Sequence, residues 1–211
     1  MRNRIEIPKG IYGITGDNFS NGRSNYFCVE EMIKGGIKIV QYRAKTKDTR
    51  EKVKEAREIR ELCRKNGVIF IVNDNVDIAL LVDADGVHIG QEDMHPDDVR
   101  KLIGDNKIIG LSTHSEKQGM EAYKNPNVDY IGVGPIFPTT TKDTTPVGLG
   151  YLEYAVKNLD LPFVAIGGIK AHNIDAIIAK GAQRVCLVSE IVGADSISCL
   201  LYTSDAADEA R

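Results

Sequence analysis

Residues 68–73 read VIFIVN, a short run of β-branched and aromatic residues that is apolar at nearly every position. A strand with one face in water alternates apolar and polar residues, whereas a strand buried on both faces is continuously apolar, as in a parallel sheet. The polar residues Asn73 and Asp74 come where this strand should end. The segment therefore predicts a buried parallel strand that carries polar groups at its carboxyl end.

Seven further runs of this kind lie on either side of the first one. They span residues 10–15, 37–42, 85–90, 107–112, 128–134, 162–168 and 184–189, and only the run at 85–90 is mixed in polarity. Between the runs, apolar residues recur at helical spacing, most clearly within 29–33, 53–62, 99–103 and 174–178. Eight strands alternating with helices predict an α/β fold of the (β/α)8 TIM-barrel class at minimal size. A doubly wound open sheet is the alternative, and the count of eight strands disfavours it.

The ends of the predicted helices carry their own signals. Asp48 followed by Glu51 is typical of a capping box at a helix start. Glycine follows the helical stretches at Gly36, Gly67 and Gly104, where it accepts the left-handed conformation that ends a helix. Each local signal agrees with the same alternation of helix and strand.

We expect a single barrel domain over residues 1–200 and an atypical C-terminal tail over residues 201–211. Ile197, Leu200 and Leu201 make about one apolar turn, and no apolar stripe follows them. The last helix is therefore predicted to be truncated, leaving the first and last strands partly uncovered. We interpret the tail as a non-native end joined to unrelated coding.

Composition narrows the class of protein. The 211 residues include 27 Lys and Arg against 30 Asp and Glu, a net charge of −3, which argues against a nucleic-acid binder. No apolar run approaches the ~20 residues that span a bilayer, and no signal peptide is visible, so we expect a cytoplasmic protein. The four cysteines and four histidines are scattered, which disfavours a zinc site. Homo-oligomerisation stays open.

Polar residues and glycines, together with Val188, directly follow the apolar runs, at the end where the active site of such a barrel lies. They are Gln41, Arg43, Lys45, Asn73, Asp74, Gln91, Glu92, Asp93, Ser112, Thr113, His114, Thr139, Thr141, Lys142, Gly167, Gly168, Val188 and Ser189. Cations beside paired carboxylates suit a metal-bound diphosphate. Glycines and hydroxyls after the last two strands suit a monophosphate. The sequence alone thus predicts a barrel that handles two phosphorylated small molecules.

Each of these residues also has a plainer interpretation. Arg43 and Lys45 suit a surface ion pair, and Asp74 and Asp93 suit helix capping. The irregular stretch 135–148 holds three prolines and five threonines, and such a long loop is either functional or simply solvated. His114 suits a general base, although a lone histidine is more often structural.

Six motifs, in order across most of the chain, are more specific than any one residue. They are QYRAK (41–45), VNDNVDIAL (72–80), ADGVHIGQED (84–93), GLSTH (110–114), GPIFPTTTKD (134–143) and AIGGI (165–169). Together they strongly resemble the thiamine-phosphate synthase family. That family couples 4-amino-2-methyl-5-(diphosphooxymethyl)pyrimidine to 4-methyl-5-(2-phosphooxyethyl)thiazole, which yields thiamine monophosphate and pyrophosphate on a magnesium-dependent (β/α)8 barrel.

The resemblance implies a role for each matching position. It assigns the pyrimidine diphosphate to Gln41, Arg43, Lys45, Asn73, Ser112 and Lys142. It assigns the thiazole phosphate to Thr139, Thr141, Gly168, Val188 and Ser189, and Mg²⁺ to Asp74 and Asp93. Lys142, Arg43 and Ser112 are the implied catalytic residues, because the family reaction is dissociative and charge builds on the leaving pyrophosphate.

Two departures and two alternatives accompany the resemblance. The family more often has glutamate where this chain has Ala44, whose side chain we expect to point away from Gln41 and Arg43. The short C-terminal end is the second departure. The alternative functions are a thiazole tautomerase of the same fold and a catalytically silent phosphate-ligand binding barrel. Magnesium dependence separates the synthase from both.

Overall fold

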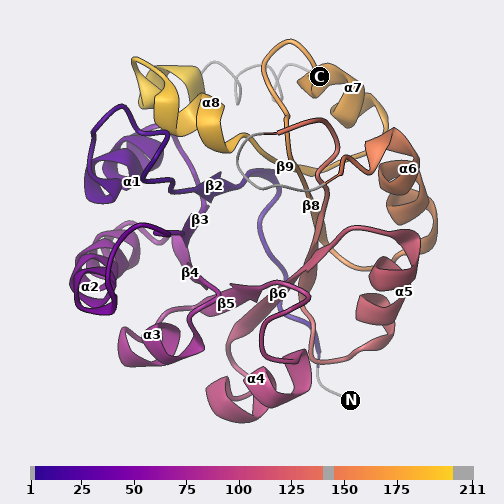
Figure 1. Ribbon diagram of the computed structural model, residues 1–211, viewed down its shortest axis with the longest axis horizontal. Helices are drawn as coiled ribbons and strands as arrows, with labels where there is room; N and C mark the ends of the chain where they lie inside the picture. The colour runs from indigo at the N-terminus through magenta and orange to yellow at the C-terminus, as the bar shows by residue number, and fades with distance from the viewer. Residues whose placement is uncertain (1–2, 140–144, 202–211) are drawn as a thin grey trace.

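The computed structural model describes residues 3–139 and 145–201, in which a parallel sheet is ringed by helices (Figure 1). The strands are β1 (Gly10–Ile11), β2 (Gly13–Ile14), β3 (Ile39–Tyr42), β4 (Ile69–Asn73), β5 (Gly86–Ile89), β6 (Ile108–Thr113), β7 (Tyr130–Val133), β8 (Phe163–Ile166) and β9 (Arg184–Cys186). All pairings are parallel, in the order β1-β9-β8-β7-β6-β5-β4-β3-β2.

The first predicted strand is split in two at Tyr12, and this split closes the barrel. β1 pairs with β9, in the register Ile11 to Val185, and β2 pairs with β3, in the register Ile14 to Gln41. The two edges of the sheet are therefore halves of one segment. The predicted (β/α)8 barrel is confirmed, and the open-sheet alternative is wrong.

The helices lie outside the strands, one after nearly every strand along the chain (Figure 1). They are α1 (Asn25–Lys34), α2 (Thr49–Lys65), α3 (Val76–Leu81), α4 (Pro96–Ile103), α5 (Glu116–Lys124), α6 (Gly148–Asn158), α7 (Ile174–Ala179) and α8 (Val188–Gly193). Asp48 and Glu51 form the predicted capping box of α2. Gly104 ends α4 with a φ of 76°, as its position predicts.

Two details of the sequence prediction are wrong. The run 184–189 is a strand only as far as Cys186, because α8 begins at Val188 and takes Ser189 into its first turn. Apolar residues at the start of a short helix look like the end of a strand in sequence. Leu102, one of the apolar residues expected to face the core from α4, is 52% exposed, whereas Val99 of the same helix is fully buried.

Buried apolar side chains form two separate layers. The larger layer fills the space between the strands and the helices, with contributions from every helix, such as Val29, Ile59 and Leu152. A smaller cluster fills the barrel interior and is built from Ile7, Tyr12, Ile14, Ile39, Ile71, Ile108, Tyr130, Val164 and Cys186. The strands are buried on both faces by these two layers, which explains why their sequences are continuously apolar.

The amino-terminal segment closes the lower end of the barrel, the end where the strands begin. Ile7 is 2% exposed within the interior cluster, and Arg184 donates to the Ile7 carbonyl oxygen at 2.8 Å. Ile5 N donates to Asp129 Oδ1 at 2.8 Å. Any open site must therefore lie at the opposite end, where the strands finish.

The last described turn packs on α1. Residues 197–201 are helical, Ile197 and Leu201 are buried, and Ser198 Oγ donates to Glu31 Oε2 at 2.9 Å. The contact is close, since a Cβ built on Gly35 would lie 2.7 Å from Leu201 Cβ. Residues 202–211 lie outside the described part of the chain. The division into a 1–200 domain and a 201–211 tail, and the truncated last helix, stay predictions.

All four cysteines are free thiols, of which Cys28, Cys63 and Cys186 are buried and Cys199 is exposed. Within residues 3–139 and 145–201, every helix falls short of the length and apolar character that crossing a membrane requires.

Candidate active site

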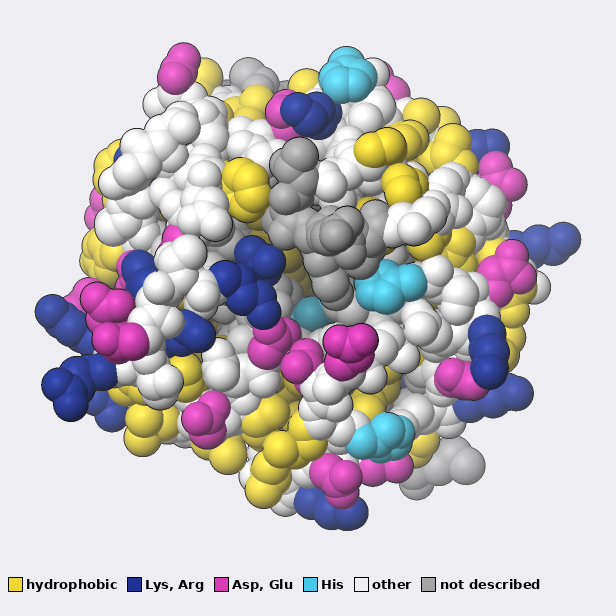
Figure 2. All heavy atoms as spheres, in the orientation of Figure 1, with side chains coloured by type: hydrophobic (Ala, Val, Ile, Leu, Met, Phe, Trp, Pro, Cys, Tyr) yellow, Lys and Arg dark blue, Asp and Glu magenta, His cyan; other side chains and the backbone are white. Residues whose placement is uncertain are grey.

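A cavity of about 610 Å³ opens at the carboxyl ends of the strands. Figure 2 shows a hollow at this end of the barrel, with Lys or Arg and Asp or Glu side chains gathered at its rim. The predicted site residues that line the cavity are Gln41, Arg43, Lys45, Asn73, Asp74, Asp93, Ser112, Thr139, Gly168, Val188 and Ser189. Thr141 and Lys142 lie outside the described residues, so their placement stays a prediction.

Five polar residues on the cavity floor are joined in a series of hydrogen bonds across the barrel, and we name them the floor network. Gln41 Nε2 donates to Tyr12 Oη at 3.1 Å, and Tyr12 Oη lies 2.6 Å from Tyr130 Oη. Tyr130 Oη lies 2.9 Å from His88 Nδ1, and His88 Nε2 lies 3.0 Å from Ser112 Oγ. The network thus connects Gln41 with Ser112, two residues predicted to contact the same substrate.

Sheet register explains how these side chains meet. His88 of β5 pairs with Gly110 of β6, and Gly110 pairs with Tyr130 of β7, so the three residues form one row. A Cβ on Gly110 would lie 2.2 Å from Tyr130 Cζ and 2.4 Å from His88 Nδ1. Only glycine at this position lets the two rings touch across the middle strand.

Burial raises the pKa of the Tyr12 and Tyr130 phenols far above their usual 10, so both keep their hydrogens.

Sequence reasoning missed Tyr12, His88 and Tyr130 as site residues. A signal was available, because each is a polar residue inside a run that is otherwise apolar, and a strand buried on both faces tolerates such a residue only with a partner. The partners come from strands far apart in sequence, and no single run reveals them.

The loop that carries Arg43 and Lys45 is held from both sides. Thr15 Oγ1 accepts from Arg43 N at 2.8 Å and donates to the Arg43 carbonyl oxygen at 3.0 Å. Asp17 Oδ2 accepts from Thr46 Oγ1 at 3.0 Å. These contacts fix the backbone on which Arg43 stands.

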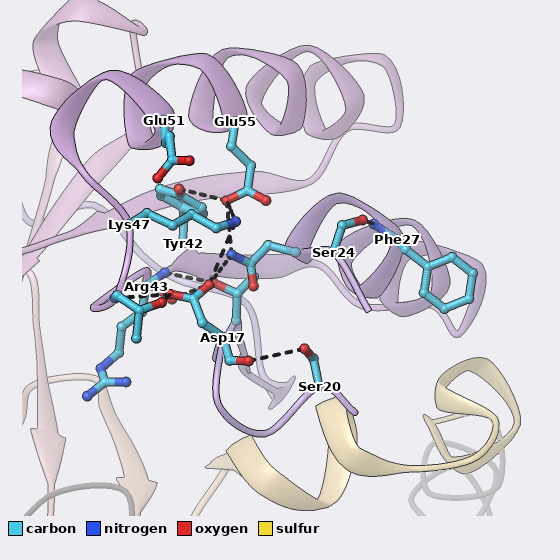
Figure 3. A network of polar contacts seen from close by, with 12 residues as sticks. Asp17, Ser20, Ser24, Phe27, Tyr42, Arg43, Lys47, Glu51 and Glu55 are labelled. Atoms are coloured by element: carbon cyan, nitrogen blue, oxygen red, sulfur yellow. Dashed lines mark hydrogen bonds and ion pairs between the residues drawn. The ribbon is translucent and has the colours of Figure 1, made fainter. Parts of the chain in front are cut away.

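A polar network continues from this loop to α2 (Figure 3). Lys47 Nζ lies 2.5 Å from Glu55 Oε2 and 3.8 Å from Asp17 Oδ1. Tyr42 Oη donates to the same Glu55 oxygen at 2.8 Å. The Arg43 side chain extends away from this network, and it lines the cavity. The network therefore supports the loop and leaves the Arg43 guanidinium facing the cavity.

Two carboxylates reach the cavity from neighbouring strand ends. Asp74, which follows β4, has one oxygen 2.5 Å from Lys45 Nζ, and its backbone has a φ of 59°. Asp93, which follows β5, accepts from Gly90 N through Oδ2 at 2.7 Å. Among the described residues no three His, Cys, Asp or Glu side chains form a metal-binding group. Two carboxylates on one cavity nevertheless fit Mg²⁺, which takes few protein oxygens and completes its shell with water and phosphate.

Small residues form the opposite wall of the cavity. Gly168 has a φ of 63°, and a Cβ there would lie 2.4 Å from the Pro138 carbonyl oxygen. Phe137 N donates to the Gly167 carbonyl oxygen at 3.0 Å, so the segment that leads to Thr139 runs directly over the glycine turn. Gly168, Thr139 and Ser189 therefore face one part of the cavity and leave room for a ligand there.

His114 stands at the root of the loop that follows β7. Its Nδ1 lies 2.5 Å from the Gly134 carbonyl oxygen, and its backbone N donates to Gln118 Oε1 at 2.7 Å. A carbonyl only accepts, so Nδ1 carries a hydrogen. His114 also lines the cavity, and this tautomer leaves Nε2 as an acceptor, so the structural role and the general base both stay predictions. Ala44 is buried in the outer core and is absent from the cavity lining, as expected.

Comparison with known proteins agrees with this geometry. The family model described as thiamine monophosphate synthase matches residues 11–191. A thiamine-phosphate synthase of Pelotomaculum thermopropionicum is 59% identical over 193 residues, which cover 90% of this chain and 88% of that protein. One from Caldicellulosiruptor bescii is 52% identical over 189 residues, covering 89% and 86%.

A solved structure matches the fold as well as the sequence. The structure of thiamine phosphate pyrophosphorylase from Pyrococcus furiosus superposes with a TM-score of 0.85 at 34% identity, covering 95% of both chains. The matched segment includes every described residue of the cavity lining, from Tyr12 to Ser189. On fold, sequence and site together, this chain belongs to the thiamine monophosphate synthase family.

Proposed function

We propose that this protein is a thiamine-phosphate synthase, a transferase of small-molecule substrates. It joins 4-amino-2-methyl-5-(diphosphooxymethyl)pyrimidine to 4-methyl-5-(2-phosphooxyethyl)thiazole and releases pyrophosphate with thiamine monophosphate. The observation that carries the proposal is one cavity with two unlike halves. One half holds Arg43, Lys45 and two carboxylates, and the other holds Gly168, Thr139 and Ser189.

The cation-rich half takes the pyrimidine diphosphate. Arg43 offers a planar fork of donors for phosphate oxygens, and Lys45 and Asn73 stand beside it. Ser112 and Lys142 contact the same diphosphate. Asp74 and Asp93 hold Mg²⁺, which supplies positive charge to the diphosphate when it is bound. Lys45 Nζ lies 2.5 Å from Asp74 Oδ2, so this cation stands beside one of the two proposed metal ligands.

The other half takes the thiazole phosphate. Backbone groups at Gly168 and Val188, with the hydroxyls of Thr139, Thr141 and Ser189, bind its oxygens. Monophosphate binding after the last two strands is common in barrels of this class. The two substrates then meet over the floor network, which places the pyrimidine ring between Gln41 and Ser112.

The chemistry asks for charge neutralisation rather than for a strong base. The bond from the pyrimidine methylene to the diphosphate breaks first, and negative charge grows on the departing pyrophosphate. Arg43, Lys142 and Ser112 stabilise that charge by hydrogen bonds and proximity. The thiazole nitrogen then bonds to the methylene carbon. The reaction requires that water be kept from that carbon while it is electron-deficient.

The test is a product assay with both substrates, first with magnesium and then with a chelator. We expect thiamine monophosphate with the metal and none with the chelator. The variant Asp74→Asn should lower the rate steeply. Its matched control is Asp77→Asn, because Asp77 lies three residues further on, in the first turn of α3 and outside the cavity.

Other outcomes point elsewhere. A folded protein that isomerises the thiazole phosphate but joins nothing would indicate the tautomerase. One that binds both phosphates without reaction would indicate the silent binding barrel. The relatives reported above carry the name of the synthase, and neither alternative has support from them. The cytoplasmic location and a homo-oligomeric state stay predictions.

A further inference from the structure

The floor network connects Gln41 and Ser112, two predicted contacts of one substrate, through Tyr12, Tyr130 and His88. Gln41, Tyr12 and Tyr130 are 3%, 2% and 1% exposed, and each hydrogen bond in the series is between 2.6 and 3.1 Å. A buried polar series of this length is costly unless every member is satisfied. All five residues line the cavity, and Gln41 and Ser112 are the two ends of the series.

When the imidazole is neutral, both phenol hydrogens find an acceptor within the series in only two ways. Each phenol has one hydrogen, and a neutral imidazole donates through one nitrogen and accepts through the other. In the forward order, the Gln41 amide N–H donates to Tyr12, Tyr12 donates to Tyr130, Tyr130 donates to His88 Nδ1, and His88 Nε2–H donates to Ser112. In the reverse order, every donor becomes an acceptor. Reversing only part of the series would either leave one phenol hydrogen without an acceptor in the series or require one phenol to donate twice.

The two orders present different groups to the cavity. In the forward order, Ser112 has already accepted from His88, so its hydroxyl hydrogen points to a ligand, and the Gln41 carbonyl oxygen is available as an acceptor. In the reverse order, Ser112 spends its hydrogen on His88, and Gln41 presents its amide N–H₂ instead. The hydrogen bond from Gln41 Nε2 to Tyr12 corresponds to the forward order.

We propose that the floor network couples the two ends of the pyrimidine site, so that an anion at Ser112 and a hydrogen-bond donor at Gln41 each favour binding of the other. This inference rests on the proposed function. An anion at Ser112 requires the forward order, and the exocyclic amino group of an aminopyrimidine at Gln41 requires the same order. Tyr12, Tyr130 and His88 are positioning residues, which act through Gln41 and Ser112.

The sheet is built to permit this coupling. Gly110 leaves the gap through which His88 and Tyr130 meet, and the ring centroids of these two residues lie 5.4 Å apart. Tyr12 and Tyr130 are tilted at 43° with centroids 5.9 Å apart, an ordinary aromatic contact. Replacing either tyrosine by phenylalanine therefore removes one hydroxyl and keeps the ring packing.

The test uses magnesium pyrophosphate as the probe, because it occupies the diphosphate end alone. Gln41→Glu introduces a carboxylate that only accepts, which imposes the reverse order and turns the Ser112 hydrogen away from the probe. Titration calorimetry would measure probe binding in four proteins: wild type, Gln41→Glu, Tyr130→Phe and the double variant. We expect Gln41→Glu to weaken binding about tenfold when Tyr130 is intact and only about two- to threefold in the Tyr130→Phe background.

The design separates coupling from simple repulsion, because the added negative charge is the same in both backgrounds. Tyr12→Phe breaks the network at a second point and should remove the difference in the same way. Circular dichroism melts would confirm that each variant is folded. An equal loss in both backgrounds overturns the coupling, and product formation by the wild type leaves the proposed function standing. A wild type that neither forms product nor binds the probe overturns both.

Discussion

Each end of the barrel buries a polar network, and the two differ in where their hydrogen bonds finish. At the lower end, Arg100 donates to the carbonyl oxygens of Gly104, Lys107 and Asn127 and to Asp129 Oδ2. Asp129 also accepts from the backbone N–H groups of Ile5 and Ile109. At the upper end, the floor network runs from Gln41 to Ser112, and both of these residues face the cavity.

The difference separates what holds the barrel together from what it presents to ligands. The lower network bonds to backbone and side-chain groups of the protein itself, and its ion pair is 6% exposed at Arg100 and fully buried at Asp129. Its loss should destabilise the fold and spare the chemistry. The upper network has protein partners in its middle, and both of its ends face the cavity where we propose that the substrate binds. Its loss should spare the fold and change the chemistry.

The strongest way to break this comparison is Asp129→Ala. It removes the carboxylate that accepts from the buried Arg100 guanidinium and from two backbone N–H groups. We expect the free energy of unfolding to fall by about 3–5 kcal/mol. Urea denaturation would measure it, and the kcat of the folded fraction should stay within about twofold. A destabilisation below about 1 kcal/mol, or a selective loss of kcat, would contradict the assignment.

Arg43→Met tests the upper end with the next largest effect. Methionine keeps the aliphatic length and removes the donors that we assign to the diphosphate. We expect kcat/KM to fall roughly 100-fold, which corresponds to a loss of about 3 kcal/mol of transition-state stabilisation. The melting temperature should stay close to that of the wild type. Arg43→Lys keeps the charge but not the fork, and should recover only part of the loss. Unchanged steady-state kinetics in Arg43→Met would place Arg43 outside the site.

Two neighbouring hydroxyls on β6 sharpen the comparison within one strand. Ser112 faces the cavity, whereas Thr113 is fully buried on the other face, where it donates to the Gly132 carbonyl oxygen at 2.8 Å. Ser112→Ala should lower kcat/KM, with a loss of about 2 kcal/mol of transition-state stabilisation, and should leave the free energy of unfolding unchanged. Thr113→Val should cost about 1–2 kcal/mol of stability and leave kcat/KM unchanged. Steady-state kinetics and thermal melts of both variants test this contrast. If both variants lose kcat/KM and stability to the same extent, Ser112 and Thr113 do not have the separate roles assigned to them.

The smallest expected effect is at Asp17, which supports the loop of Arg43 from outside the cavity. Asp17→Ala removes the acceptor of Thr46 Oγ1 and of Asn25 Nδ2, which lies 2.7 Å from Asp17 Oδ1. We expect KM for the pyrimidine diphosphate to rise by about fivefold, near 1 kcal/mol, with kcat little changed. Asp17→Asn keeps an acceptor and should have less effect. A fall in kcat at constant KM would count against a role in positioning the loop.

The local features of the fold were predictable from sequence, because they depend on neighbours along the chain. The eight runs, the capping box at Asp48 and the helix end at Gly104 are all present. The errors arose where a local pattern is ambiguous. Val188 and Ser189 continue an apolar run but begin α8, and Leu102 has helical spacing but faces solvent.

The site was predictable only in part, for a physical reason. Residues such as Arg43, Asp74 and Gly168 follow strands, and the carboxyl ends of parallel strands meet at one end of a barrel. The floor network depends instead on sideways register between strands, which no single strand encodes. His88 and Tyr130 are 42 residues apart and become partners only when β5, β6 and β7 are aligned.

Gly110 has a consequence for how this protein can change over evolution or in the laboratory. Barrels of this class are often treated as sets of interchangeable strand–loop units, in which each loop varies independently. Here a side chain of β5 contacts a side chain of β7 across Gly110 of β6, which has no side chain to separate them. Grafting any one of these three units from another barrel would sever the row unless the donor carries the matching residue. The three strands β5, β6 and β7 should therefore be kept together in any exchange between barrels, and their loops should be varied together.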